Sequence, residues 1–348
     1  MGGSCLRGNW RMAYWALIPV GYQLVTVLAA VAFLLRRRAA PLKDWPPVSI
    51  LKPTSKGQLP PEEALNSNRN QDYPCHEVIA DDSAGFETPN RKVGKLMALV
   101  AAAKHNVIVV NDADIRVPTD YLRDVVATLH QPGVGLVTCL FRARGDQFAS
   151  NFEAFGITAD FMPSILVARL MGIREFGMGA TLALRRETLK RIGGFPAIAR
   201  YIADDYQLAK KINELGEKVE LANVIVETDV HGNWTQVFRH QTRWARTIRC
   251  SRPGAYAGLP VSHAGVWALA AALTGQYSWA IALIGLRVLT ALVAGVGILR
   301  SPIARNWWWA APVWDLFAFV IWIAGWTGST VEWQGRNLQL NQKGEIVS

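Results

Sequence analysis

A charge-free run of 24 residues near the start of the chain limits the folds that are open to it. The run covers positions 12–35 and reads MAYWALIPVGYQLVTVLAAVAFLL. Because about 20 apolar residues in a helix cross a bilayer, the run predicts a membrane-spanning helix. A signal peptide would have a shorter apolar segment of about 7 to 15 residues, followed by a small-residue cleavage pattern. The run is followed instead by the cations Arg36, Arg37, Arg38 and Lys43. By the positive-inside rule, these predict that the amino terminus lies outside and that the next residues face the cytosol.

A second apolar region lies near the other end of the chain. Positions 264–286 carry no charge, Arg287 follows, and the stretch 306–329 contains a single charged residue, Asp315. We expect two or three membrane crossings within 262–329, followed by a tail at 330–348. Arg287 inside such a helix is costly unless it is paired or reaches the lipid headgroups. Pairing with Asp315 and snorkelling to the headgroups both meet that demand.

The charged residues narrow the choice of partners. The net charge is +10, but no nucleic-acid-binding motif accompanies it, so we expect no nucleic acid partner. A basic cluster ahead of the second apolar region favours anionic headgroups or a phosphate-bearing ligand, and its members are Arg239, Arg243, Arg246, Arg249 and Arg252. Among them, Arg249 and Arg252 are expected to face solvent or headgroups. The four cysteines, Cys5, Cys75, Cys139 and Cys250, show no metal-site spacing and are expected to be reduced structural thiols.

Residues 45–250, between the two apolar regions, alternate short β-rich runs with helical stretches. Strands are expected in PVSILKP, HEVIADD and NVIVVNDAD, with helices in PPEEALNSNRNQ and NRKVGKLMALVAAAKH between them. Such alternation predicts parallel strands in an α/β sheet. Further along, PGVGLVTCLFR is expected to form one strand, 151–175 an apolar helical region, GATLALRRETLKRIGGF a strand and a helix, and YIADDYQLAKKINELG a helix that Gly216 ends.

Each of the first three strands ends in a pair of residues suited to contact a ligand: Lys52 with Pro53, Asp81 with Asp82, and Asp112 with Asp114. Ligands of α/β sheets bind beyond the carboxyl ends of the strands. We therefore expect one cleft to collect all three pairs.

Asp112 and Asp114 follow the strand VIVV and are spaced to point the same way. Two such carboxylates can hold a hard divalent cation, Mg²⁺ or Mn²⁺, which keeps ligand positions open for phosphate groups. The alternative is that they only cap a turn. Asp204 and Asp205 open a predicted helix, where carboxylates also suit the positive end of the helix dipole without any further role.

Seven segments, in order, resemble those of the ceramide glucosyltransferases and the related bacterial hopanoid glycosyltransferases: VSILKP, EVIADD, NRKV, NDADIRV, GVGLVTC, YIADDYQLA and HQTRWARTIR. The likeness continues to VEWQGRNLQL and so covers most of the chain. It implies a GT-A fold, which is a Rossmann-like α/β domain for nucleotide-diphospho-sugars, flanked here by transmembrane helices. It also implies a UDP-sugar donor, inversion at the anomeric carbon, and a signature of three aspartates with (Q/R)xxRW.

The resemblance assigns roles to particular positions. Asp81 or Asp82 matches the first aspartate, which contacts the uridine, and Asp112 matches the second. Asp205 matches the third aspartate, the catalytic base. The implied donor-binding residues are Pro53, Asp81, Asp82, Lys92 near the diphosphate, Asp112, His240, Arg243 and Trp244, and the implied metal ligands are Asp112 and Asp114. Trp244 either stacks on a substrate ring or anchors the domain beside the membrane.

Two departures from the family pattern stand out. His240 occupies the position three before Arg243, where the family has Gln or Arg, although Gln241 is adjacent. The segment between Asp82 and Asn90 is also shorter than in relatives. Either the sheet has lost an edge unit or the uridine pocket is incomplete, and the retained later motifs favour a trimmed but functional fold.

We therefore expect an integral membrane hexosyltransferase that moves a sugar from a UDP-sugar to a lipid hydroxyl. The acceptor is ceramide or a hopanoid, the latter with UDP-N-acetylglucosamine as donor, and the resemblance places the protein in a bacterial inner membrane with its catalytic domain in the cytosol. The rival interpretations are a processive polysaccharide synthase and a non-catalytic membrane scaffold. The stretch 161–173, FMPSILVARLMGI, either packs in the core or admits the lipid tail.

Overall fold

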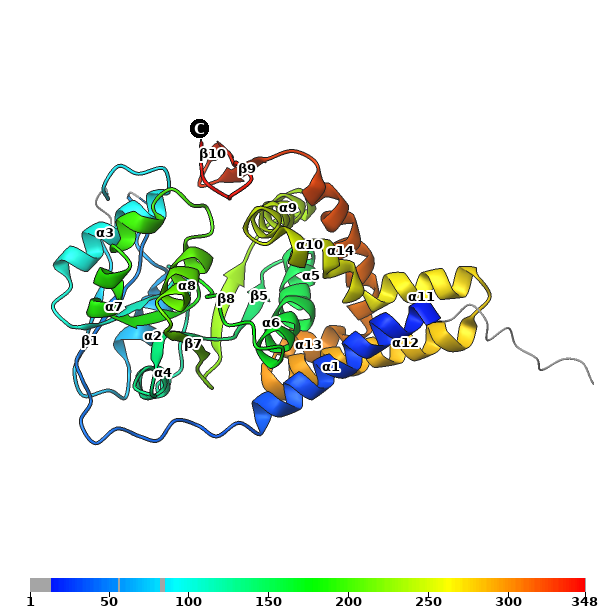
Figure 1. The fold of residues 1–348 in the computed structure, drawn as a ribbon, viewed down its shortest axis with the longest axis horizontal. Coiled ribbons are helices and arrows are strands. Elements are labelled where there is room, and N and C mark those ends of the chain that lie inside the picture. The colour runs from blue at the N-terminus through cyan, green and yellow to red at the C-terminus, as the bar shows by residue number, and fades with distance from the viewer. Residues whose placement is uncertain (1–13, 56, 82–84, 348) are drawn as a thin grey trace, which may run out of the picture.

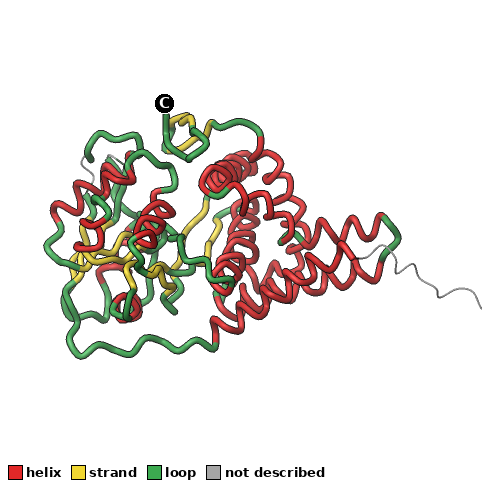
Figure 2. Tube along the Cα trace, viewed as in Figure 1, coloured by secondary structure: helices red, strands yellow, loops and turns green. Residues whose placement is uncertain are grey.

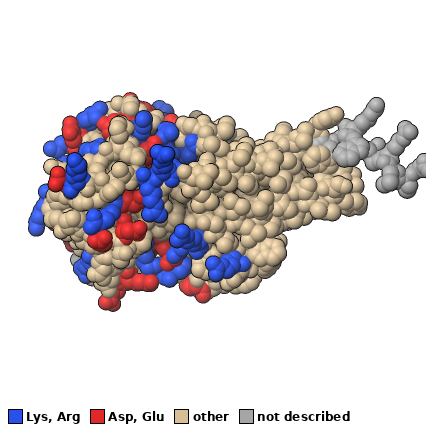
Figure 3. Space-filling model, turned by 90° about the horizontal axis from the view of Figure 1, so that it is seen from below, with Lys and Arg blue, Asp and Glu red and all other residues tan. Residues whose placement is uncertain are grey.

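The computed structural model describes residues 14–55, 57–81 and 85–347, which form two halves (Figure 1). One half holds nearly all the strands together with short helices, and the other is built of longer helices (Figure 2). In the view of Figure 3 the charged side chains gather over the strand-containing half, whereas the far end of the helical half shows none. The division agrees with the predicted split between a polar domain and membrane segments.

The strand-containing half is organised around a six-stranded sheet with the order β2-β1-β3-β6-β4-β7. As predicted, β1 pairs in parallel with both β2 and β3. The predicted parallel pattern is wrong for β6, which runs antiparallel to β3 and β4. The strands are β1 (Val48–Leu51), β2 (His76–Ile79), β3 (Val107–Val110), β4 (Val134–Thr138), β6 (Leu182–Arg185) and β7 (Lys218–Leu221).

The path of the chain after β4 explains why β6 is reversed. The chain leaves the carboxyl edge of the sheet after β4, passes through the helical half, and returns at the same edge. The backbone nitrogen of Asp112, which follows β3, donates to the carbonyl of Gly179, which precedes β6, at 3.2 Å. Because no crossover carries the chain to the opposite edge, the returning strand must run backwards.

Both faces of the sheet are covered, which accounts for β3, a strand that is apolar at every position. Val107 and Val109 of β3 pack into a cluster with α4 and α1, and Ile108 and Val110 pack into a second cluster with α3 and α8. The covering helices are α2 (Glu62–Arg69), α3 (Arg91–Ala102), α4 (Tyr121–Leu129), α7 (Arg186–Arg191) and α8 (Asp204–Glu214), with the 3₁₀ helix Phe195–Ile198. The predicted end of α8 at Gly216 is confirmed, since Gly216 has a φ of 81°.

The predicted single strand PGVGLVTCLFR is divided in two. Its second part, β5 (Phe141–Gly145), leaves the main sheet and pairs in parallel with β8 (Val226–Val230) in a small sheet of its own. The small sheet leads the chain from the polar half towards the helices. It is followed by α5 (Phe148–Gly156), the π-helix Ile157–Phe161 and α6 (Met162–Leu170).

Within the described residues, three helices are long and apolar enough to cross a membrane: Tyr14–Leu34, Tyr277–Ile298 and Pro302–Trp326. The pair Pro253–Val261 and Ala264–Leu273, bent by 49°, is a broken fourth span or a re-entrant loop. Positions 12 and 13 of the predicted first span lie outside the described residues. The elements of this half are the 3₁₀ helix Tyr14–Ala16, α1 (Leu17–Leu34), α9 (Trp234–Ser251), α10 (Pro253–Gly258), the 3₁₀ helix Leu259–Val261, α11 (Ala264–Leu273), α12 (Tyr277–Thr290), the π-helix Ala291–Ile298, α13 (Pro302–Trp307), the 3₁₀ helix Trp308–Ala310 and α14 (Ala311–Trp326).

A hairpin of β9 (Thr330–Trp333) and β10 (Arg336–Gln339) follows the last span. It lies above α9, between the two halves of the molecule (Figure 1). The tail predicted at 330–348 is thus folded, as far as Val347, against the rest of the protein.

The two charges in the second apolar region form the predicted pair. Nε of Arg287 donates to Oδ1 of Asp315 at 2.9 Å and to Oδ2 at 3.0 Å, and both side chains are buried. The Arg287 guanidinium also donates to the carbonyl of Ala159, and Asp315 accepts from the backbone nitrogen of Gly265, both at 2.8 Å. Pairing, not snorkelling, is how this arginine is accommodated.

We predict that Arg287→Leu lowers stability by about 3 to 5 kcal/mol, because it leaves the Asp315 carboxylate buried without its cation. The double variant Arg287→Met with Asp315→Leu should recover most of the loss. Thermal unfolding in detergent measures both, with the exposed Arg305→Leu as the matched control. If Arg287→Leu proved as stable as this control, the pair would not hold the helices together.

Candidate active site

The residues that follow β1 and β3 meet at the carboxyl edge of the sheet. The buried side chain of Lys52 donates from Nζ to the carbonyl oxygens of Asp112 at 3.2 Å and Ile115 at 3.1 Å. Burial lowers the pKa of Lys52 to about 8, although Asp114 and Asp112 act against it. Lys52 therefore holds the loop after β3 in place.

Lys92 joins three elements at this edge. Its Nζ lies 2.8 Å from Oδ1 of Asp112, which follows β3, and 3.1 Å from Oδ2 of Asp204, which begins α8. Burial acts to lower the pKa of Lys92, but Asp112, Asp204 and Asp205 outweigh it and raise the pKa well above its usual range. Gly179 permits this approach, because a Cβ there would lie 2.6 Å from Oδ2 of Asp112. Lys92, which the family resemblance predicts to lie near the diphosphate, is thus a cation held in place by carboxylates.

Asp112 and Asp114 have different partners, since Asp112 pairs with Lys92 and Asp114 is held by β8. Oδ2 of Asp114 accepts hydrogen bonds from the Thr228 hydroxyl and from the backbone nitrogen of Asp229, the latter at 3.1 Å. The backbone nitrogen of Ile115 donates to the carbonyl of Asp112 at 3.2 Å. Because this bond closes a turn, the alternation of a strand no longer sets the direction of the side chains.

The two aspartates still fit a divalent cation. Within the described residues, Oδ2 of Asp112 and Oδ1 of Asp114 take part in no hydrogen bond, and both residues line the same cavity. Two hard oxygens suit Mg²⁺ or Mn²⁺ when phosphate and water supply the other ligands. In the part of the chain that the structure describes, no group of three or more His, Cys, Asp or Glu side chains forms an all-protein metal site.

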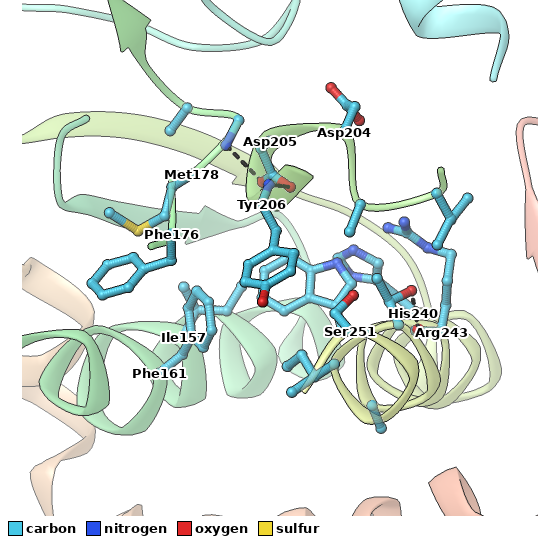
Figure 4. A pocket seen from close by; sticks show the side chains of 18 of the residues that line it. Ile157, Phe161, Phe176, Met178, Asp204, Asp205, Tyr206, His240, Arg243 and Ser251 are labelled. Atoms are coloured by element: carbon cyan, nitrogen blue, oxygen red, sulfur yellow. Dashed lines mark hydrogen bonds between the residues drawn. The ribbon is translucent and has the colours of Figure 1, made fainter. Parts of the chain in front are cut away.

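Asp205 is held at both carboxylate oxygens and faces the cavity (Figure 4). Oδ2 accepts from the backbone nitrogen of Gly179 at 3.0 Å, and Oδ1 accepts from that of Tyr206 at 2.8 Å. Burial and, after it, the charge of Asp204 raise the pKa of Asp205 to about 6, against the opposing charge of Lys92. A carboxylate with this pKa is suited to accept a proton near neutral pH.

Arg243 enters the cavity from α9, opposite Asp205 (Figure 4). Burial lowers its pKa, and the charges of Asp112, Glu153 and Asp205 act in the other direction. Among the described residues, none of these carboxylates lies within ion-pair distance of the guanidinium. Arg243 is therefore a half-buried cation that remains available to an anionic ligand.

Glu153 of α5 explains the departure at His240. Nδ1 of His240 lies 2.5 Å from Oε1 of Glu153, and Nε2 of Gln241 donates to the same oxygen at 2.7 Å. Glu153 is buried, and the sequence analysis missed it. The one signal for it was a charged residue inside an apolar helical stretch. His240 and Gln241 are thus engaged with the protein itself, and Glu153 fixes the middle of α9 against α5.

Trp244, a residue of α9, packs against the membrane-side wall of the cavity. Its ring centroid lies 5.3 Å from that of Phe161 and 5.0 Å from that of His240. It is half-buried against the core and also lines the cavity. The geometry makes it an anchor with one face left open to a ligand.

Residues 85–89, the part of the shortened segment after Asp82 that the structure describes, lie in a wall of the cavity. Asp82 itself lies outside the described residues. Asp81 lies 3.3 Å from Nζ of Lys95 and does not line the cavity, whereas Lys95 and Pro53 do. The positions 85–89 line it as well, and β2 is the edge strand of the described sheet.

The residues after α14, from 327 to 347, include the β9–β10 hairpin and join α9 to the loop before Asp204. We call this segment the carboxyl-terminal strap. Arg249 donates to the carbonyls of Trp326 at 2.9 Å and Gly328 at 2.8 Å, and Arg252 lies 3.3 Å from Glu175. The expectation that Arg249 and Arg252 face headgroups or solvent is therefore wrong, because these side chains bind other parts of the chain. On its other side the strap pairs with the segment 200–202 through Ile346 and Gly344.

The strap also adds residues that the sequence analysis did not assign to the site. Trp333 and Arg336 face each other across the hairpin and both line the cavity. Apolar residues join the strap to its neighbours in one cluster: Ile202, Cys250, Val331, Leu338, Leu340 and Ile346. Cys75, Cys139 and Cys250 are free thiols, as predicted, and Cys5 lies outside the described residues.

One cavity of about 1660 Å³ connects the site residues with the helical half. Its polar end is lined by Lys92, Asp112, Asp114, Asp205 and Arg243. The same cavity continues between helices of the membrane half, where its walls include Leu259, Trp314, Ile321 and Trp322. A polar reaction centre and an apolar chamber are therefore continuous.

Comparisons with known proteins agree with this arrangement. The family model for glycosyl transferase family 21 matches residues 80–346. Ceramide glucosyltransferase 1 of Caenorhabditis elegans is 22% identical over 135 residues, which cover 38% of this chain and 29% of that protein. The chain thus spans less than a third of the length of this curated relative.

Two solved structures are similar over part of the chain. One is glucosyl-3-phosphoglycerate synthase from Mycobacterium tuberculosis in complex with Mn²⁺, UDP and phosphoglyceric acid, with 15% identity, coverage of 59% of this chain and 78% of that one, and a TM-score of 0.34. The other is a mycobacterial protein, with 15% identity, coverage of 64% and 77%, and a TM-score of 0.34. The family match, together with the mixed sheet and the candidate spans, confirms the predicted class of a GT-A-type α/β domain flanked by membrane helices.

We predict that Gly94→Ala lowers stability by about 1 to 3 kcal/mol, because a Cβ there meets backbone that cannot rotate away. It would lie 2.1 Å from the carbonyl oxygen of Phe86 in the cavity wall. Gly285→Ala is the matched control, since a Cβ at Gly285 has nothing within 4 Å and alanine favours a helix. Thermal unfolding that ranks the two variants equally would refute the close packing of this wall.

Proposed function

The chain belongs to glycosyl transferase family 21, and from this premise we propose that it is a membrane-bound inverting hexosyltransferase that moves the sugar of a UDP-sugar onto a lipid hydroxyl. Ceramide and a hopanoid polyol are the two acceptors that the sequence supports. The proposal includes a cytosolic active site at the inner face of a bacterial membrane.

One observation carries the proposal. The cavity that holds Asp112, Asp205 and Arg243 extends without interruption between helices apolar enough to lie in a bilayer. An amphiphile cannot leave the membrane without losing the stabilisation of its buried chain, about 0.8 kcal/mol per CH₂ group. A cavity of this shape lets the acceptor keep its tail in apolar surroundings while its hydroxyl reaches the polar end.

The chemistry of the leaving group requires positive charge at the diphosphate. Arg243, half-buried and without an ion-pair partner among the described residues, supplies fixed charge where the negative charge develops. A divalent cation held by Asp112 and Asp114 would supply Lewis-acid stabilisation of the diphosphate. Lys92 keeps Asp112 in place and prevents Asp112 and Asp204 from repelling each other.

Activation of the acceptor is the task of Asp205. The backbone donors at Gly179 and Tyr206 fix the carboxylate, and each oxygen retains a lone pair that can accept the hydroxyl proton. Base assistance of this kind contributes about 10²- to 10⁴-fold to the rate. Attack from the face opposite the diphosphate inverts the anomeric carbon and gives a β-linked product from an α-linked donor.

The direct test uses purified full-length protein in lipid nanodiscs with UDP-glucose or UDP-N-acetylglucosamine, Mn²⁺, and either ceramide or a hopanoid polyol. We predict a product with one added sugar, detected by mass spectrometry, and its loss with a chelator or with Asp112→Ala. The physical reason is that Asp112 provides one of two protein oxygens for the cation.

Three outcomes would contradict parts of this proposal. Undiminished transfer by Asp112→Ala in chelator would refute the metal assignment. A long polymer would indicate a polysaccharide synthase. Donor hydrolysis equal to that of Asp205→Asn, with no transfer to either lipid, would indicate a non-catalytic scaffold.

A second prediction concerns pH. A base must be deprotonated to work, and burial raises the pKa of Asp205 to about 6. The rate should therefore rise as the pH increases through about 6 and level off above it. Asp205→Asn should lower kcat by about 10²- to 10⁴-fold while donor affinity changes little, since the group acts in the transition state.

Steady-state kinetics across about pH 5 to 8, with UDP binding measured separately, checks this prediction. Asp120→Asn is the matched control, because Asp120 is exposed and its side chain caps no helix. A wild-type rate that ignores pH over this range, or a loss confined to donor binding, would remove the base role from Asp205.

A further inference from the structure

Polar groups line the membrane-side end of the cavity, where apolar walls alone would suffice for a lipid tail. Tyr22 comes from α1, Asp160 from the π-helix Ile157–Phe161, and Ser262 and His263 from the bend before α11. Ionisable groups among membrane helices are rare and usually mark a functional site.

The neighbours of these groups inside the helical half are paired. Arg287 is bound to Asp315, the hydroxyl of Thr290 donates to Gln23 at 2.8 Å, and the Gln23 amide donates to the carbonyl of Ser262 at 2.9 Å. The polar groups of this network are partners for one another. The network therefore does not explain why further polar groups lie at the cavity wall.

The groups that face the cavity are not satisfied in the same way. In the described part of the chain, the Asp160 carboxylate accepts one hydrogen bond, from Nε1 of Trp314 to Oδ2 at 3.2 Å, and forms no ion pair. Nδ1 of His263, a residue only 4% exposed, has no partner among the described residues. A buried polar group left without a partner costs about 1 to 3 kcal/mol. A partner from outside the chain would remove that cost.

The backbone presents Asp160 in a fixed position. The π-helix, a form that is frequent at functional sites, carries it into the cavity wall. Gly156 lets the Trp314 ring lie against this wall, because a Cβ at Gly156 would lie 2.1 Å from the indole. The indole that donates to Asp160 is therefore packed in place, as a pre-organised site requires.

The charges select the kind of ligand. Near this end of the cavity, the positive charge of Arg287 acts on His263, but Arg287 is already paired with Asp315. The negative charge of Asp160 therefore exceeds the positive charge available to neutralise it. A carboxylate repels a phosphate and accepts hydrogen bonds from hydroxyl and amide N–H groups. Tyr22, Ser262 and the His263 ring add neutral donors and acceptors.

The position relative to Asp205 completes the argument. Ile157 and Phe161, on the same π-helix as Asp160, line the cavity across from Asp205 and Tyr206 (Figure 4). We propose that Asp160, with His263 and Tyr22, binds a second, uncharged polar group of the acceptor, a hydroxyl or amide, while the reacting hydroxyl lies at Asp205. This inference rests on the proposed function, and it makes the acceptor a neutral diol, polyol or hydroxyamide in preference to a lipid phosphate.

The test compares three acceptors of equal chain length in nanodiscs with full-length protein: a primary alcohol, the matching 1,3-diol and the matching alkyl phosphate. We expect wild type to favour the diol over the alcohol in kcat/KM by about 10- to 100-fold, as one hydrogen bond to a charged group allows. Asp160→Ala should bring the diol-to-alcohol ratio close to one, and Asp160→Asn, which keeps an acceptor oxygen, should give an intermediate ratio.

Asp120→Ala is the matched control and should leave the ratio unchanged. His263→Ala offers a second route if Asp160→Ala fails to fold, and it should lower the same ratio. Equal use of diol and alcohol by wild type, or a ratio that Asp160→Ala and His263→Ala both leave intact, would overturn the inference while the proposed function stands. Preference for the alkyl phosphate would also overturn it. Transfer to none of the acceptors, nor to ceramide or a hopanoid polyol, would remove both the proposed function and the inference.

Discussion

Three carboxylates can share one small space in this protein because Lys92 lies among them. Its ammonium group contacts Asp112 and Asp204 and lies close enough to Asp205 for their charges to interact. Without a fixed cation, like charges brought this close would repel the ends of β3 and α8 from each other. The arrangement joins the sheet, α3 and α8 at one point. Arg243, which approaches from α9, has no ion-pair partner among the described residues.

The reversed strand β6 and the carboxyl-terminal strap bring the remaining parts to this point. The segment before β6 places Gly179 beside Asp112, and the backbone nitrogen of Gly179 donates to Asp205. The strap binds α9 through Arg249 on one side and reaches the chain ahead of Asp204 on the other. The orientation of Arg243 towards Asp205 therefore depends on residues near the carboxyl terminus, among them Trp326 and Gly328. The hairpin also brings Trp333 and Arg336 into the wall of the cavity.

The helical half also contains buried charged groups, which need partners. Charges and amides within it are paired with one another, as the contact between Arg287 and Asp315 shows. The cavity-facing Asp160 and His263 lack such partners among the described residues. The contrast separates polar groups that hold the helices together from polar groups that are available to a ligand. It also links the depth of the cavity to the choice of acceptor.

Local features of the sequence determined the elements with strong patterns. Short β-rich runs predicted β1 and β3, a glycine predicted the end of α8, and charge-free runs predicted the candidate spans. The ordered motifs also predicted that Asp112, Asp205 and Arg243 belong to one site. The tertiary structure alone decided that β6 runs backwards, that Asp114 turns to β8, that Glu153 engages His240, and that Arg249 binds the strap. Periodicity records which face of an element is buried, but these four features depend on contacts between distant segments, which no local pattern encodes.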